Sequence, residues 1–281
     1  MGVLRMYQDH PSKTLGPQAA HLVVELHERG KTLFSHADVE EITSLQAKSA
    51  RNFVASLVRR GVVSRLKPGL FVLVPFELGR ERNYLGSPYV VARELAGGGD
   101  YFVSHASAMS LHRMVTQPQL VMYTTAPQSI RPRVVLGTPF RFVRCKPEHL
   151  FGVTEHWVTK TEKVRVSDLE RTIVDGLKQP EYCGGFTEVA KGFGMRRDDI
   201  DSGKLVDYAL RIGVGAVIRR LGFLLETLAV DAPRELDRLQ EHLTATYAIL
   251  DPLLPDAGKF TARWRLRLNV DPDEVAAVIR T

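Results

Sequence analysis

Residues 44–74, with the sequence SLQAKSARNFVASLVRRGVVSRLKPGLFVLV, hold two different hydrophobic periodicities in direct succession. In the first half, apolar side chains recur at helical spacing and predict an amphipathic helix over residues 46–59. In the second half, two β-rich runs flank the pair Pro68-Gly69, which favours a tight turn. Residues 62–74 therefore predict a β-hairpin that follows the helix directly.

Two further helices are predicted before this helix and hairpin. Residues 15–29 carry an apolar stripe at helical spacing, and Gly30 then stops the pattern as a C-cap glycine would. After a short strand-like run, Ser35 can cap a second helix by accepting a hydrogen bond from the backbone N–H of Asp38. Ser44 is predicted to cap the third helix. Three helices and a hairpin in this order indicate a winged helix-turn-helix.

The rest of the chain predicts a second, larger domain. Residues 75–87 mix proline, glycine and charged residues without periodicity, so we place the boundary near residue 80. The expected fold class is α+β, with a winged helix-turn-helix at 1–80 and a larger mixed α/β domain at 81–281. In this domain helices are predicted at 88–95, 104–113, 169–177 and 187–193, a mainly helical region at 205–249, and strands at 121–125, 133–136, 140–145, 163–167 and 264–270.

Positive charge is concentrated in the smaller predicted domain. Residues 1–80 carry 11 Lys and Arg against 7 Asp and Glu, whereas residues 81–281 carry 27 against 25. A small basic helical domain is typical of proteins that bind polyanions, because contacts to phosphates release counterions from the duplex. A basic surface that binds nothing is the alternative, and only a motif can decide between them.

The polar face of the third helix has side chains suited to reading DNA. Arginine can bind guanine through two hydrogen bonds, and asparagine or glutamine can bind adenine in the same way. In the hairpin, two cations flank the turn and can reach the minor groove or phosphates. A solvated helix face is the alternative, and the adjacent hairpin favours DNA. The candidate DNA-binding residues are Gln46, Lys48, Ser49, Arg51, Asn52 and Arg59 on the helix and Arg65 and Lys67 in the hairpin.

A second basic run lies in the larger domain, and its role stays open. The segment 130–146 holds Arg131, Arg133, Arg141, Arg144 and Lys146 without an acidic residue. Strand alternation would place Arg141, Val143 and Cys145 on one face and Arg144 on the other, so the five charges cannot share one surface. A soluble, exposed sheet is therefore favoured over a binding site.

Enzymatic groupings are weak in this sequence. One group of residues close in sequence could suggest a metal-dependent nuclease: the carboxylates of Asp168, Glu170, Asp175 and Glu188 could hold Mg²⁺, with Lys191 near the attacking water. However, Glu188 and Lys191 are three residues apart on a predicted helix, a spacing that favours ion pairs and helix capping. We expect no catalytic residues, no metal and no cofactor.

The histidines and cysteines also favour structural roles. His105 and His112 lie seven residues apart without a third ligand nearby, and Cys145 and Cys183 have no CxxC partner. The first residues lack the apolar core of a secretory signal, and no apolar run is long enough to span a bilayer. We therefore expect a cytoplasmic protein.

Three segments resemble the AbiEi family of antitoxins, transcriptional regulators encoded beside nucleotidyltransferase-like toxins of the abortive-infection type. They are GVVSRLKPGLFVL at 61–73, YFVSHASAMSLHRM at 101–114 and SDLERTIVDGLKQPEYCGGFTEVAKGF at 167–193. In the third segment, the Glu-Arg-Thr sequence, the aspartate and the Cys-Gly-Gly sequence follow the family's pattern. Together the segments extend from residue 61 to residue 193.

The resemblance implies a winged helix that binds double-stranded DNA at inverted repeats in its own promoter. It also implies a C-terminal domain that helps to neutralise the cognate toxin of a type IV toxin-antitoxin system, by a direct complex or an indirect route. Glu170, Arg171 and Asp175 suit an internal ion-pair network better than a catalytic centre. The alternatives are a metal-dependent nuclease with a winged-helix head and a protein-interaction module.

Overall fold

The computed structural model describes residues 13, 15–115, 117 and 119–277, so the N-terminal residues 1–12 of the predicted first domain lie outside the described part. The chain forms two compact units. The first consists of Met1–Val91, Val134–Gly137 and Val158–Glu162, and the second consists of Ala92–Arg133, Thr138–Trp157 and Lys163–Thr281. The boundary that the sequence predicts near residue 80 lies within the first unit.

The first unit contains three helices and a three-stranded antiparallel sheet of order β1-β3-β2. Apolar side chains of all three helices meet those of the sheet in one core, where Leu22, Leu26 and Leu57 are fully buried. A short 3₁₀ helix, η1 (Phe76–Leu78), follows the sheet. The elements are α1 (Pro17–Glu28), β1 (Leu33–Ser35), α2 (His36–Thr43), α3 (Ala47–Arg59), β2 (Val63–Lys67) and β3 (Leu70–Leu73).

Local capping explains most of the boundaries in this unit. Ser35 and Asp38 form the predicted cap reciprocally, since each side chain accepts from the other's backbone N–H. Gly30, just after α1, has φ +62°, which glycine adopts without steric cost. The prediction for Ser44 is wrong: it ends α2 in the left-handed conformation, and Gln46 is the N-cap of α3 without a side-chain capping bond. An N-cap residue typically has an extended backbone, which the left-handed Ser44 does not have.

A six-stranded mixed sheet has the order β6-β7-β5-β4-β9-β8, and its strands other than β6 belong entirely to the second unit. Strands β5 and β7 pair in parallel, as do β4 and β9, whereas β4 with β5 and β8 with β9 are antiparallel. The structure adds β4 and β8 to the strands that the sequence predicts. The strands are β4 (Phe102–Val103), β5 (Met122–Ala126), β6 (Arg133–Val135), β7 (Thr138–Arg144), β8 (Val153–Trp157) and β9 (Lys163–Ser167).

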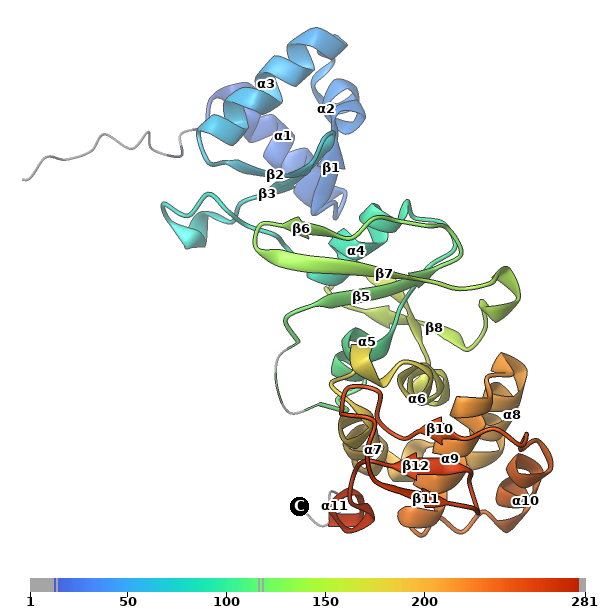
Figure 1. The fold of residues 1–281 in the computed structure, drawn as a ribbon. Helices are drawn as coiled ribbons and strands as arrows, with labels where there is room; N and C mark the ends of the chain where they lie inside the picture. Colours follow the sequence, from blue (N-terminus) through green and yellow to red (C-terminus); the bar gives the residue numbers. More distant parts are fainter. Residues whose placement is uncertain (1–12, 14, 116, 118, 278–281) are drawn as a thin grey trace, which may run out of the picture. The chain divides into compact units, whose positions relative to one another are not determined.

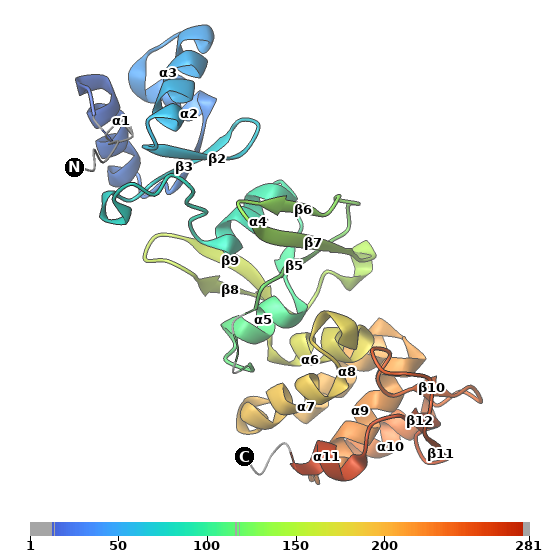
Figure 2. The same ribbon diagram turned by 60° about the vertical axis from the view of Figure 1, so that its left-hand side comes forward.

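Helices α5 and α6 lie on one side of this sheet, against β5 and β9, and further helices pack behind them (Figures 1 and 2). Beyond the helices lies a small sheet of order β10-β12-β11. The remaining elements are α4 (Pro88–Ala96), α5 (His105–Leu111), η2 (Pro147–His149), α6 (Leu169–Lys178), η3 (Pro180–Tyr182), α7 (Phe186–Met195), η4 (Arg197–Asp199), α8 (Ser202–Ile212), α9 (Gly215–Thr227), α10 (Pro233–Glu241), β10 (Ala248–Ile249), β11 (Lys259–Thr261), β12 (Leu266–Leu268) and α11 (Pro272–Ala277).

Helix α9 attaches the small sheet to the helices. Gly222 allows the fully buried ring of Trp264 to approach the helix, because a Cβ atom at this position would lie 2.1 Å from the ring. The buried side chains of Arg219 and Arg220 donate hydrogen bonds to backbone carbonyls of residues 244–250. These bonds hold the segment 244–250 against α9.

The protein is therefore a mixed α/β protein with several sheets. Among the described residues, no helix is both long and apolar enough to cross a membrane.

Candidate nucleic-acid interface

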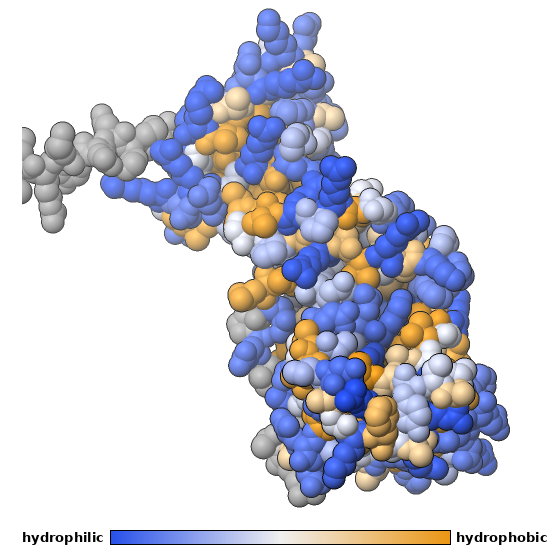
Figure 3. Space-filling model, viewed as in Figure 1, coloured by the Kyte–Doolittle hydropathy of each residue, from blue (hydrophilic) through white to orange (hydrophobic). Residues whose placement is uncertain are grey.

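Helix α3 presents one apolar and one polar face, as its spacing predicts. Ala50, Val54 and Leu57 are buried in the core of the first unit. The six predicted residues of this helix and its N-cap all lie exposed: Gln46, Lys48, Ser49, Arg51, Asn52 and Arg59. Hydrophilic residues cover the region of α3 in the space-filling view (Figure 3). The core thus fixes which side chains of α3 face the solvent.

The exposed face of α3 is positively charged. The helix has no acidic residue, and within the described part of the chain no ion pair involves Lys48, Arg51 or Arg59. On the neighbouring helix α2, two acids are engaged elsewhere, since Glu41 pairs with Arg29 at 2.6 Å and Asp38 pairs with Lys31. Cations without a counter-charge are available to phosphates or to the acceptor atoms of guanine.

The β2–β3 hairpin places its two predicted cations differently. Arg65 is exposed, while Lys67 is half-buried beside the turn at Pro68 and Gly69. The strand register shifts between Arg65 and Lys67, so the regular alternation of faces is interrupted there. Strand β2 contacts α3, which brings the hairpin and the helix together in one unit. Arg65 is therefore the better placed of the two to contact phosphate.

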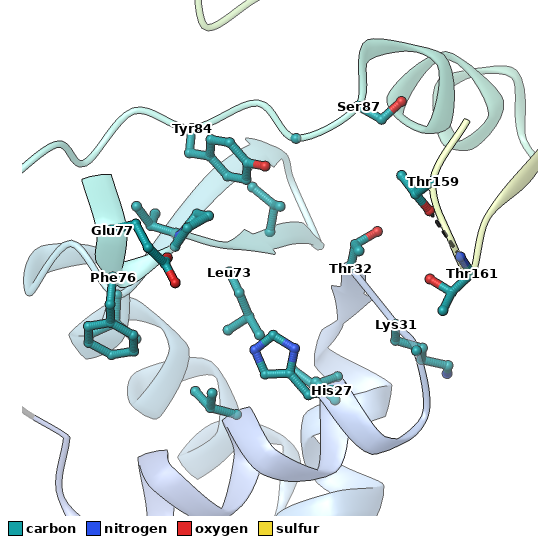
Figure 4. A pocket seen from close by; sticks show the side chains of 18 residues that line it. His27, Lys31, Thr32, Leu73, Phe76, Glu77, Tyr84, Ser87, Thr159 and Thr161 are labelled. Carbon is teal, nitrogen blue, oxygen red and sulfur yellow. Dashed lines mark hydrogen bonds between the residues drawn. The ribbon is translucent and has the colours of Figure 1, made fainter. Parts of the chain in front are cut away.

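A hollow of about 350 Å³ lies on another part of the first unit, between the end of α1, strand β3 and residues 74–87 (Figure 4). Figure 4 shows His27 and Leu73 at its base, with Glu77 and Tyr84 on a neighbouring segment. No sequence motif indicates this hollow, since the residues that line it come from segments that are far apart in sequence. The region predicted as a linker is attached to the sheet, because Ser64 Oγ donates to the Arg82 carbonyl.

The acidic residues of α6 form structural contacts, as the sequence predicts. Asp168 caps the helix by accepting from the Arg171 backbone N–H at 2.9 Å. Arg171 Nε lies 3.0 Å from Asp175 Oδ1, and both side chains are almost fully buried. Arg171 also donates to the carbonyls of His149 and Phe151. The pair thus joins α6 to the segment that precedes β8.

The other predicted carboxylates are paired in the same manner. Glu170 Oε2 accepts from Lys204 Nζ at 2.8 Å, and Glu188 pairs with Lys191 at 2.7 Å on α7. Burial alone would lower the pKa of Lys204, but its hydrogen bonds to Glu170 and Asp168 raise it above the usual value. Within the described residues, no three His, Cys, Asp or Glu side chains lie close enough together to hold a metal ion.

The two histidines of the second unit are held inside it. His112 Nε2 lies 2.6 Å from the Ser167 carbonyl oxygen. His105 is fully buried, its Nδ1 lies 2.9 Å from Ser104 Oγ, and burial lowers its pKa to about 4. Cys145 and Cys183 are free and buried. Burial raises the pKa of both thiols, which disfavours the reactive thiolate.

The basic segment 130–146 forms β6, β7 and their flanks. Its five predicted cations are all exposed, and Lys146 lies 3.7 Å from Glu148. Arg141 and Cys145 do not share an environment, because Cys145 follows the end of β7 and is buried while Arg141 is exposed. The alternation therefore does not extend to the end of the predicted strand.

Comparisons with known proteins give a structural match. No protein-family model matches the chain, and no curated protein does. The crystal structure of the RV2827C protein from Mycobacterium tuberculosis superposes with a TM-score of 0.71 over 97% of this chain and 98% of that one. The two sequences are 14% identical, a level at which the match speaks for the fold alone. This chain thus shares the overall fold of the RV2827C protein over nearly its entire length.

Proposed function

We propose that this chain is a DNA-binding antitoxin of a type IV toxin-antitoxin system, which represses its own operon and counteracts a nucleotidyltransferase-like toxin. In this proposal the first unit is a winged helix-turn-helix, with α3 as the recognition helix and the β2–β3 hairpin as the wing. The protein acts in the cytoplasm, where its two free thiols stay reduced.

One observation carries the DNA-binding proposal: α3 has no acidic residue and exposes three cations that form no ion pair with the described residues. They lie beside Asn52, next to a hairpin that exposes Arg65. The order of three helices and a hairpin matches that of winged helix-turn-helix proteins, which insert the third helix in the major groove. A single winged helix covers few base pairs, so we expect two copies to bind an inverted repeat in the promoter.

The antitoxin part rests on the resemblance of the three segments at 61–73, 101–114 and 167–193 to the AbiEi family. The second unit also has a core of its own, with about 180 residues that a winged helix-turn-helix does not require. Its buried carboxylates Asp175 and Glu170 form ion pairs with Arg171 and Lys204, so the proposal gives them a structural role.

The DNA-binding proposal predicts that Arg51→Ala and Arg65→Ala differ in kind. Arg51→Ala should weaken binding to the chain's own promoter by about 1–3 kcal/mol, with little effect on scrambled duplex, because it removes a contact to base edges. Arg65→Ala should weaken binding to both duplexes equally, because it removes a phosphate contact. It should also lower the slope of log affinity against log salt concentration by about one. Fluorescence anisotropy at several salt concentrations measures both.

Arg80→Ala serves as the matched control, since Arg80 is exposed in the first unit but lies outside α3 and the hairpin. It should leave both affinities unchanged. A wild-type protein that shows no preference for promoter over scrambled duplex at physiological salt contradicts the proposal. Equal losses of DNA affinity from all three substitutions contradict the roles proposed for Arg51 and Arg65.

The antitoxin proposal predicts that neutralisation does not require operator binding. In the full chain, the triple variant Lys48→Ala, Arg51→Ala, Asn52→Ala should lose promoter binding and still restore growth to cells that express the neighbouring toxin. The toxin must be expressed from an unrelated promoter, so that lost repression does not change its level. If the folded triple variant fails to restore growth while the wild type does, the two activities are not separable.

A further inference from the structure

The solvent-facing side of the small sheet β10-β12-β11 is apolar. Phe260 is 63% exposed and Tyr247 is 48% exposed, and their rings meet edge to face with centroids 5.2 Å apart. Leu253 and Leu254, in the loop after β10, are 51% and 44% exposed. We call these four side chains the apolar patch. Exposed apolar side chains that cluster together, rather than lying scattered over the surface, are typical of an interaction surface.

The segment that carries the apolar patch is held rigidly. Arg219 Nη2 donates to the Thr246 carbonyl at 2.7 Å, and Arg220 donates to the carbonyls of Ile249 and Leu250. After β10, the Asn269 side chain bonds the backbone of Asp251 in both directions. A surface that is already ordered loses little conformational entropy on binding.

The shape of the apolar patch combines a protrusion and a hollow. The exposed ring of Phe260 forms part of the rim of an open hollow of about 560 Å³, whose lining also includes Tyr247, Leu254 and Arg267. A two-fold interface brings a surface against its own copy, so each protrusion must meet a hollow of the same surface. Phe260 and the neighbouring hollow meet this requirement.

The charges at the apolar patch are also self-complementary. Arg267 Nη1 lies 2.7 Å from Asp256 Oδ1, and Arg267 lies over the Phe260 ring at 5.3 Å. Its Nε is buried without a hydrogen-bond partner among the described residues. In a two-fold contact, like charges would meet at the centre unless the counter-charge belongs to the same surface. Asp256 provides this counter-charge.

We propose that the apolar patch is an interface between two copies of this chain. Phe260 of each copy enters the hollow of the other, and Arg267 reaches the partner's Asp256. This contact requires no DNA, so it stands or fails independently of the proposed function. It would also supply the second copy that an inverted repeat needs.

Sedimentation of the full chain without DNA, across micromolar concentrations, tests the proposal. The wild type should show a monomer–dimer equilibrium, and Phe260→Asp should raise the dimer Kd by about tenfold or more, because it places a charge at the centre of the contact. Trp157→Asp is the matched control, since Trp157 is 58% exposed on β8, outside the patch. A wild type that stays monomeric, or equal weakening by both variants, overturns the proposal.

A mixing experiment tests the crossed ion pairs. Arg267→Glu and Asp256→Lys should each weaken the dimer alone, because each leaves four like charges at the interface. Mixed together, they should form a heterodimer of nearly wild-type affinity, since the introduced glutamate then meets the introduced lysine while the remaining Arg267 and Asp256 meet each other. If circular dichroism shows both variants folded and mixing restores no dimer, the charges do not cross between copies and the proposed interface is wrong.

Discussion

Arg171→Ala should lower the free energy of unfolding of the second unit by about 3–5 kcal/mol, the range observed when one partner of a buried ion pair is removed. Arg171 and Asp175 are 1% and 5% exposed at their side chains. The substitution would leave the Asp175 carboxylate buried without its cation, and would take the donor from the carbonyls of His149 and Phe151. Such a loss is a large share of the stability of a typical domain.

Urea denaturation followed by the fluorescence of Trp264 measures this loss, because Trp264 is buried in the second unit. Lys191→Ala is the matched control: its ion pair with Glu188 is 2.7 Å long but exposed, so it should cost less than about 1 kcal/mol. The double variant Arg171→Met, Asp175→Leu should regain much of the stability, because no unpaired charge remains. Similar losses for Arg171→Ala and Lys191→Ala would show that burial does not set the strength of the pair.

The stability of the second unit should also fall as the pH decreases from about 6.5 to about 4, because of His105. Burial lowers the pKa of His105 from 6.5 to about 4, against the opposing attraction of Asp175. The unfolded chain therefore takes up this proton at a higher pH than the folded chain, and protonation favours unfolding over this interval. The full effect, reached below pH 4, is about 3 kcal/mol.

His105→Asn isolates this contribution. Asparagine does not titrate here and tolerates the left-handed backbone of this position, where φ is +51°. The free energy of unfolding should therefore fall less steeply with decreasing pH in the variant than in the wild type, whatever the difference at neutral pH. Burial also lowers the pKa of His112 and His149, so the stability of the variant still depends in part on pH. Parallel curves for the two proteins would exclude His105 as the cause.

The candidate DNA-contacting face follows from sequence because its geometry is local. The apolar positions Ala50, Val54 and Leu57 recur at helical spacing, and their burial leaves the intervening polar residues on the outside. The hairpin is also predicted from sequence, but one detail is not: the strand register shifts after Arg65, and Lys67 is half-buried. Such a shift depends on how β2 pairs with β3, which the residues of β2 alone do not specify.

The apolar patch of the second unit and the hollow of the first unit could not be predicted from local sequence patterns. Tyr247 directly precedes β10 and Phe260 lies on β11, and their exposure depends on the small sheet that α9 holds in place. Arg219 and Arg220 look like surface cations in sequence, yet both are buried and bond to backbone carbonyls of a distant segment. Long arginine side chains can be buried wherever enough acceptors converge, and convergence is a property of the fold.

The sequence by itself determined those features whose interactions close within a few residues. Ser35 and Asp38 are three residues apart, Pro68 and Gly69 set their turn directly, and Arg171 and Asp175 are one helical turn apart. Only the tertiary structure decided the order of the six-stranded sheet, in which β4 pairs with β9 about sixty residues later in the chain. It likewise decided the N-cap of α3 and the environment of the buried arginines. Local hydrogen bonds and periodicity are encoded by adjacent residues, whereas pairing partners and burial depend on which distant segments pack best together.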